Sequence, residues 1–181
     1  MSSPAVPTAT VKKTLRRFRR NRRGSAAVEF ALVAPVFFAL LFAIIETAIV
    51  FFASQVLETV TQDSARMIMT GQAQNAGYSQ SQFKTYVCGK ISVLFDCVNG
   101  IYVDVQSYPG FSSVSINDPI DASKNFVPPN NYSAGGPGDI VVVRLFYQWP
   151  LIVTGLGYNI ANLSGSKRLL TATAAFRNEP Y

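Results

Sequence analysis

The sequence predicts an α+β fold, in which a long N-terminal transmembrane helix continues as an amphipathic stalk and packs against a small antiparallel β-sheet domain. Two observations carry this prediction. An apolar segment runs from Phe30 to Ala53 with Glu46 as its only charged residue, and beyond residue 100 the apolar residues alternate with a period of two. As a helix, roughly 24 residues at about 1.5 Å each extend about 36 Å, which is enough to cross the hydrocarbon core of a bilayer.

The charges around this span predict its orientation. Beyond it, Arg66 is the first basic residue, whereas a dense basic cluster precedes it. By the positive-inside rule the N-terminus stays in the cytoplasm, and the chain beyond residue 54 is exported. The cluster consists of Lys12, Lys13, Arg16, Arg17, Arg19, Arg20, Arg22 and Arg23.

Two other interpretations of this N-terminal region were weighed. A basic arm can bind nucleic-acid phosphates without sequence preference, but the apolar span that follows favours membrane targeting. A removable secretory signal has an apolar region of about 7 to 15 residues. The segment here is longer and carries Glu46. The predicted partner is therefore the membrane, and no nucleic acid is expected.

The predicted organisation is a basic cytoplasmic leader at 1–24, a transmembrane helix at 25–54, an amphipathic helical stalk at 55–76 and an exported α+β domain at 77–181. Within that domain, Pro and Gly residues mark a long surface loop at 117–138. The apolar stripe of the stalk follows helical spacing and is expected to face the core. It consists of Val56, Leu57, Val60, Ser64, Met67 and Ile68.

Local signals place the elements of the exported domain. Ser79 followed by Gln82 forms a capping box that opens a short helix reaching about Leu94. Residues 101–108 alternate apolar and polar side chains, which predicts a half-buried strand. Two further strands are expected with one apolar face each, namely Val141, Val143, Leu145, Tyr147 and Trp149, and then Leu170, Ala172, Ala174 and Phe176.

The charge of the whole chain, +6, comes from the leader. Removing residues 1–24 takes away eight basic and no acidic residues, which leaves eight basic against ten acidic residues and a net charge of −2. The exported part is therefore not a basic protein. About 105 residues beyond the stalk suffice for one domain with a modest core.

Nothing in the sequence assembles the chemistry of an enzyme. The chain has no histidine, and it has no Walker or dinucleotide glycine pattern. Its acidic residues are scattered singly, so no general acid and base or activated nucleophile is predicted. We expect no catalytic residue, no cofactor, no metal and no small-molecule substrate.

The two cysteines, Cys88 and Cys97, lie nine positions apart in the part predicted to be exported. In an oxidising compartment this arrangement favours an intrachain disulfide. The alternative is a pair of unrelated buried thiols. A metal site is less favoured, because the chain has no histidine and no second cysteine pair.

The residues after the basic cluster have a distinctive spacing. Gly24 is followed by four small or apolar residues, then Glu29 and Phe30. This pattern resembles the type IV prepilin cleavage site, and more closely that of the TadE-like pseudopilins of the Tad/Flp system. Phe30 departs mildly from the tyrosine that is most typical there. The resemblance implies that a membrane-embedded aspartyl prepilin peptidase cuts after Gly24, so that Ser25 becomes the mature N-terminus.

The resemblance extends over about residues 16 to 181 through several weak motifs in the same order. The segment DSARMIMTGQ at 63–72 resembles the pattern after the family's membrane helix, and the cysteine pair matches its exported pair. GDIVVVRLFYQWPL at 138–151 and TATAAFRNEPY at 171–181 resemble its two C-terminal strands. A pilin-like fold is therefore expected.

The resemblance implies a structural function. A TadE-like pseudopilin takes part in assembling a Tad/Flp type IVb pilus, a fibre of the adhesion and biofilm type. Its expected partners are the prepilin peptidase, other pilin-like subunits and the Tad secretion machinery. The protein is expected in the inner membrane, with its C-terminal domain in the periplasm. It is also a candidate for incorporation into the extracellular pilus. The alternative is an uncleaved single-span anchor that presents a periplasmic binding or adaptor domain.

The two glutamates of the span were interpreted differently. A carboxylate within a span is costly and invites a functional explanation. The resemblance implies that Glu29 pairs with the amino terminus of a neighbouring subunit. Glu46, near the far interface, was expected to reach the lipid headgroups.

Overall fold

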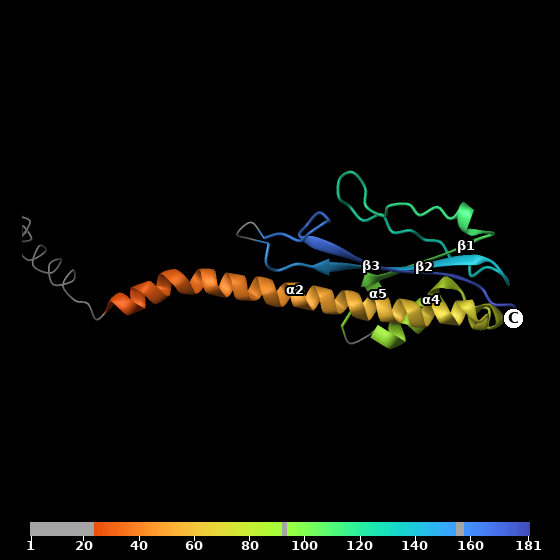
Figure 1. The fold of residues 1–181 in the computed structure, drawn as a ribbon, viewed down its shortest axis with the longest axis horizontal. Helices are drawn as coiled ribbons and strands as arrows, with labels where there is room; N and C mark the ends of the chain where they lie inside the picture. Colours follow the sequence, from red (N-terminus) through yellow and green to blue (C-terminus); the bar gives the residue numbers. More distant parts are fainter. Residues whose placement is uncertain (1–23, 92–93, 155–157) are drawn as a thin grey trace, which may run out of the picture. The chain divides into compact units, whose positions relative to one another are not determined.

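The computed structural model describes residues 24–91, 94–154 and 158–181 (Figure 1). The leader, including the basic cluster at 12–23, lies outside the described residues. The described chain divides into two compact units, one ending at Phe42 and the other comprising Ala43–Tyr181. The elements in order are α2 (Ser25–Met69), α3 (Gln72–Asn75), α4 (Gln80–Ile91), α5 (Cys97–Gly100), β1 (Ile101–Tyr108), η2 (Phe111–Ser113), β2 (Ile140–Pro150) and β3 (Lys167–Arg177). The predicted α+β class is confirmed.

The first unit contains the N-terminal part of helix α2. Its large apolar side chains are exposed, as Phe30 at 69% and Leu32 at 72% illustrate. Among the described residues α2 is the one helix long and apolar enough to cross a membrane, with a mean hydropathy of 2.6 over its most apolar window. An apolar surface that no part of the described chain buries is what a lipid-facing or subunit-facing helix requires.

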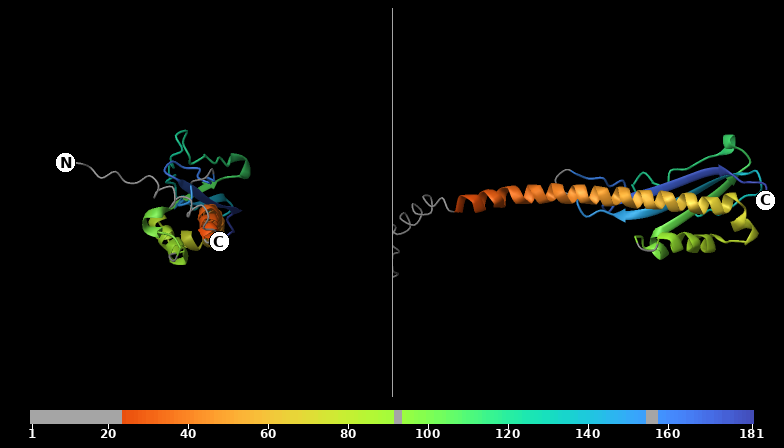
Figure 2. Two further views of the ribbon diagram at one scale, coloured as in Figure 1. Left: turned by 90° about the vertical axis from the view of Figure 1, so that its left-hand side faces the viewer. Right: turned by 60° about the horizontal axis from the view of Figure 1, so that its bottom comes forward.

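The second unit is built on a three-stranded antiparallel sheet in the order β1-β2-β3. The strand predicted at 101–108 is present with those bounds, and the other two predicted strands are β2 and β3. Helix α2, from Ala43 on, and helix α4 lie on the same side of this sheet (Figure 2). The predicted inward faces of both C-terminal strands contribute to the core, including the fully buried Val141, Val143 and Leu145.

The stalk stripe packs as its spacing predicts. Leu57 and Ile68 are completely buried, Val60 is 6% exposed, and Val56 and Met67 pack against the same core. Burial of this stripe stabilises the fold by about 25 cal/mol for each Å² of apolar surface removed from water. The core also begins earlier along the helix than the stripe, because Val50 and Ala53 are buried in it.

The capping box of α4 is confirmed. The backbone N–H of Ser79 donates to Gln82 Oε1 at 2.8 Å, and the N–H of Gln82 donates to Ser79 Oγ at 3.4 Å. The helix is described over Gln80–Ile91, residues 92 and 93 lie outside the described residues, and Leu94, its expected end, lies in a turn. A disulfide then joins Cys88 in α4 to Cys97 at the start of α5, with their Cα atoms 5.5 Å apart. It fixes both short helices to one another beside β1.

The outer face of the sheet differs from the prediction. Strand β1 was expected to be half-buried, with Tyr102, Asp104 and Gln106 on the polar side, but Asp104 is fully buried. The reason is that the segment at 117–138, although none of its residues is fully buried, also covers part of the sheet. It folds back over the sheet and forms a second small core, whose members are Phe146, Leu163 and Leu169 with Tyr102, Ile120 and Phe126 packed against them.

Local bonds hold this segment in place. The carboxylate of Asp121 accepts the N–H groups of Asn125 at 2.7 Å and Ser123 at 2.9 Å, and these bonds hold the pKa of Asp121 below its ordinary value. Farther along, Val105 exchanges backbone bonds with Asn131 and Ser133, at 3.0 and 2.9 Å. The segment therefore also covers part of the open edge of β1.

Candidate processing site and assembly elements

The residues of the predicted processing site lie at the start of α2. Gly24 immediately precedes the helix, and Ser25 is its first residue. A Cβ atom placed on Gly24 would meet nothing within 4 Å. No packing within the described structure therefore requires a glycine here.

Glu29 and Phe30 follow on the exposed surface of the helix. Glu29 makes no hydrogen bond or ion pair within the part of the chain that the structure describes. The carboxylate stands on a helix that is otherwise apolar from Ser25 to Ile45. In a membrane an unpaired carboxylate at this position would be unfavourable, so a charge of opposite sign is its natural partner.

Glu46 behaves differently from its expected role. Its side chain is only 8% exposed, and it accepts hydrogen bonds from the backbone N–H groups of Ile152 and Val153. The carboxylate thus satisfies two loop donors of its own domain instead of reaching toward lipid headgroups. No local pattern around Glu46 indicates this role, because its partners are backbone groups more than one hundred positions away.

The C-terminal tail packs against the end of α2. Gly71 has a left-handed backbone conformation, with φ at +74°, and the ring of Tyr181 covers it so closely that a Cβ on Gly71 would lie 2.3 Å from the ring. The N–H of Glu179 donates to the carbonyl of Met69 at 2.9 Å. The Thr-Gly-Gln segment and the Asn-Glu-Pro-Tyr tail, which are far apart in the sequence, therefore meet in one contact.

The side-chain amides of Asn178 and Gln74 connect this contact to the Pro/Gly-rich segment at 117–138. The side-chain nitrogen of Asn178 donates to the carbonyls of Ala134 at 2.9 Å and Gly136 at 3.0 Å. The side-chain nitrogen of Gln74 donates to the same Ala134 carbonyl at 2.9 Å. The weak C-terminal motif thus has a structural role, because it joins the stalk end, the last strand and the long loop.

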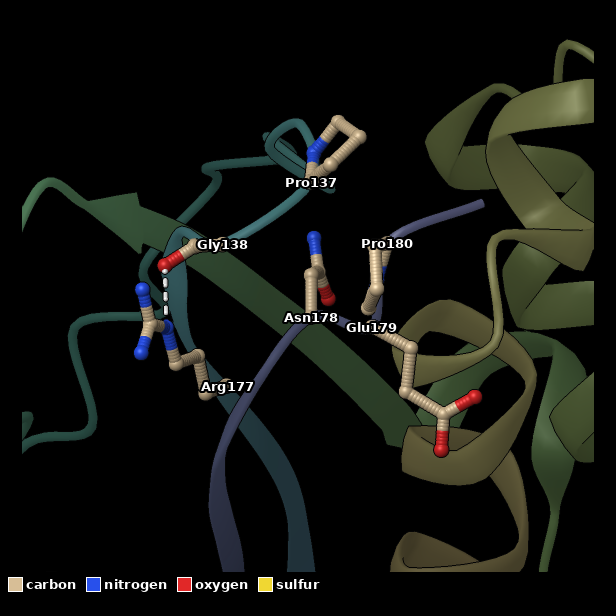
Figure 3. Close-up of a pocket in the computed structure, with 6 residues that line it drawn as sticks. All are labelled: Pro137, Gly138, Arg177, Asn178, Glu179 and Pro180. Atoms are coloured by element: carbon tan, nitrogen blue, oxygen red, sulfur yellow. Dashed lines mark hydrogen bonds between the residues drawn. The ribbon is translucent and has the colours of Figure 1, made fainter.

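A shallow pocket opens beside this junction (Figure 3). Arg177 donates from Nε to the carbonyl of Gly138 at 2.9 Å, and the side chain of Glu179 points away from that pair. The Nε of Arg177 and the Nδ2 of Asn178 donate to backbone carbonyls, whereas the Oδ1 of Asn178 is buried without a hydrogen-bond partner. Among the lining residues no nucleophile faces a base. The lining residues of the pocket are Pro137, Gly138, Arg177, Asn178, Glu179 and Pro180.

A buried ion pair crosses the sheet under the 117–138 segment. Arg144 donates to Asp104 Oδ2 from Nη2 at 2.7 Å and from Nε at 2.9 Å, and the two residues are direct partners in the β1–β2 register. Arg144 also donates to the carbonyl of Asn117 at 3.1 Å, and Asn131 donates to Asp104 at 2.9 Å. The pair thus anchors both ends of the covering segment. Sequence reasoning missed it, although opposite charges on two adjacent predicted strands were the available signal.

A comparison with known protein families finds a match in the N-terminal part of the chain. The family described as TadE-like protein matches residues 24–66. This segment is similar to TadE-like proteins. The match runs from the predicted scissile glycine through the span and most of the stalk, and it associates the chain with the Tad pilus. TadE-like proteins are components of pilus structure and assembly and are not a known enzyme family. No curated protein and no solved structure matches the chain.

Within the described residues, no group of three or more His, Cys, Asp or Glu side chains could hold a metal ion. The groups that the structure does bring together are structural: the disulfide, the ion pair, the tail junction and the Glu46 contact. Most of the exposed large apolar side chains of the described residues lie on α2, between Val28 and Phe52.

The tail junction predicts a measurable cost for a side chain at Gly71. Replacing Gly71 with alanine is expected to lower the free energy of unfolding by more than the roughly 1–2 kcal/mol that a left-handed backbone alone costs, because Tyr181 must also move. Gly77→Ala is the matched control, since Gly77 has φ at +63° but nothing within 4 Å. Urea unfolding of the detergent-solubilised chains would compare them. Equal losses in the two variants would contradict the packing role of Tyr181.

Proposed function

We propose that this protein is a pseudopilin of a Tad/Flp type IVb pilus system, cut after Gly24 by a prepilin peptidase and assembled with other pilin-like subunits. The observation that carries the proposal is that the family match begins at Gly24 itself, with Glu29 at the fifth position after it. In this account the basic leader remains in the cytoplasm, α2 anchors the mature chain in the inner membrane, and the sheet domain lies in the periplasm.

The exposed apolar helix and the unpaired Glu29 support the assembly step. Cleavage would create an α-amino group on Ser25, five positions from the carboxylate. In a low-dielectric setting the two charges of neighbouring subunits attract strongly, while each bears a desolvation cost. A correctly aligned subunit satisfies both charges, and a misaligned one satisfies neither. The pair therefore sets the register between subunits more than it adds net affinity.

Glu29→Ala tests this role. The variant is expected to be exported and to retain some processing, but to co-purify with other pilin-like subunits about tenfold less well, which corresponds to about 1.4 kcal/mol. Glu58→Ala is the matched control, because Glu58 is an acidic residue of the same helix whose only described side-chain bond is to Gln62. Affinity capture from detergent-solubilised membranes, with mass spectrometry of the N-terminus, gives both readouts.

Normal processing together with unchanged co-purification and pilus number would refute the pairing role. Glu29 would then be a recognition residue for the peptidase alone. If the wild-type chain itself is recovered uncut, the alternative of a single-span anchor with a periplasmic adaptor domain takes precedence.

A further inference from the structure

The loop after β2 is tied to helix α2 at Glu46. The N–H of Ile152 lies 2.5 Å from Glu46 Oε1, and the N–H of Val153 lies 3.2 and 3.1 Å from Oε1 and Oε2. One helical position on, the hydroxyl groups of Thr47 and Tyr158 bond to each other. The loop is therefore held beside the helix at the level of Glu46.

The side chain at the tip of this loop points outward. Ile152 is 90% exposed, whereas Leu151 just before it is 8% exposed and belongs to the core. The helix next to it is also apolar on its open surface, with Ile45 and Ile49 each 44% exposed. An isoleucine with nine-tenths of its surface exposed, on a loop bonded to a helix that itself exposes isoleucines, is an unfavourable arrangement in water.

The position along the sequence suggests what covers this surface. The hydrocarbon core of a bilayer accommodates about 20 helical residues. Counted from Ser25, about 20 residues reach Ile45, and the apolar segment continues to Ala53, so Glu46 lies in the outer part of the predicted transmembrane helix at 25–54. The next charged residue of α2 after Glu46 is Glu58, so the intervening surface carries no charge. The exposed Phe51 and Phe52 follow within this stretch, and phenylalanine is one of the residues found on the apolar face of helices that lie at the boundary between headgroups and acyl chains.

We propose that Ile152 inserts into the outer leaflet of the bilayer, at the boundary between acyl chains and headgroups, and that Glu46 fixes the loop at that depth. The inference rests on the proposed membrane anchorage of α2. At this boundary a free backbone N–H is unfavourable and so is a free carboxylate. By pairing them, the domain satisfies the Glu46 carboxylate and two loop N–H groups together while Ile152 contacts lipid. The domain is thereby held against the membrane by a second point besides the helix.

The occupant proposed is lipid, because Ile152 and the exposed side chains of the adjoining part of α2 are apolar and the surface of α2 between Glu46 and Glu58 carries no charge. The N–H groups of Ile152 and Val153 are already bonded to Glu46, and the Ile152 side chain is purely apolar. Its surface continues that of the apolar helix.

Quenching of tryptophan fluorescence by lipids tests this placement. Trp149 is the only tryptophan, so Trp149→Phe gives a background in which a single tryptophan can be placed. The full chain carrying Ile152→Trp is reconstituted in phosphatidylcholine vesicles with brominated acyl chains. We expect about a twofold loss of emission, because an interfacial side chain lies about 5–10 Å into the headgroup and acyl boundary.

Two control positions separate this inference from the anchorage itself. Phe38→Trp, on the exposed apolar part of α2, reports on the span, and Phe111→Trp, 68% exposed in η2, reports on a surface expected in water. Quenching at 38 and 152 but not at 111 supports the inference. Quenching at 38 alone overturns it and leaves the anchor intact, while no quenching at either position overturns both. If circular dichroism shows that the Trp149→Phe background is unfolded, Ile152→Trp is compared with the wild type, and unchanged fractional quenching overturns the inference.

Discussion

Arg144→Met is expected to lower the free energy of unfolding by about 3–5 kcal/mol, because removing one partner of a buried ion pair leaves the other charge uncompensated. Asp104 is fully buried beside Arg144, and with methionine at 144 it would keep only the amide donors of Gln106 and Asn131. The carbonyl of Asn117 would also lose its donor. The covering segment should therefore loosen together with the sheet.

The measurement is urea unfolding of the detergent-solubilised full chain, followed by the fluorescence of Trp149, whose ring contacts Phe95 and Tyr147 in the core. The double variant Asp104→Leu/Arg144→Met removes both charges and should recover most of the lost stability, since apolar replacements of a buried pair are often neutral. A double variant as unstable as Arg144→Met would contradict the charge argument and point to packing instead.

Gly24→Val is expected to lower the rate of prepilin peptidase cleavage by about 100-fold or more, since small displacements of a scissile bond already cost that much. A β-branched side chain at the scissile bond restricts the backbone and occupies space that the peptidase must enter. The described structure offers no competing explanation, because a Cβ at Gly24 meets nothing within 4 Å. Folding of the exported domain should be unchanged.

Ala27→Val is the matched control, because it places the same side chain in the same helix three residues beyond the scissile bond. This variant should mature normally. If Gly24→Val is processed as fast as Ala27→Val, Gly24 is not the scissile residue, and the spacing to Glu29 has another origin.

Much of the exported domain could be predicted from local patterns. The strand at 101–108 and the capping box at Ser79 and Gln82 depend on residues close in sequence, and both are present as expected. The apolar stripe of the stalk is likewise a property of one helix. Such features are determined by periodicity and by short-range hydrogen bonds, which a single sequence displays directly.

The features that were missed depend on contacts between distant segments. From the alternating pattern of its strand, Asp104 is predicted to face solvent. It is buried because the segment at 117–138 covers this face of the sheet. From its place in the sequence, Glu46 is predicted to lie near a membrane interface. No neighbouring residue indicates that the loop at Ile152 supplies backbone N–H donors to its carboxylate. A polar side chain on a predicted strand or span therefore has an uncertain environment until the covering segment is known.

The central claim is that the mature chain begins at Ser25. Intact-mass and N-terminal sequencing of the membrane-extracted protein, produced with and without an active prepilin peptidase, tests it most directly. The account predicts a chain starting at Ser25 when the peptidase is active and at the original N-terminus when it is absent. Full-length protein in both cases would contradict the account and identify the chain as an uncleaved anchor.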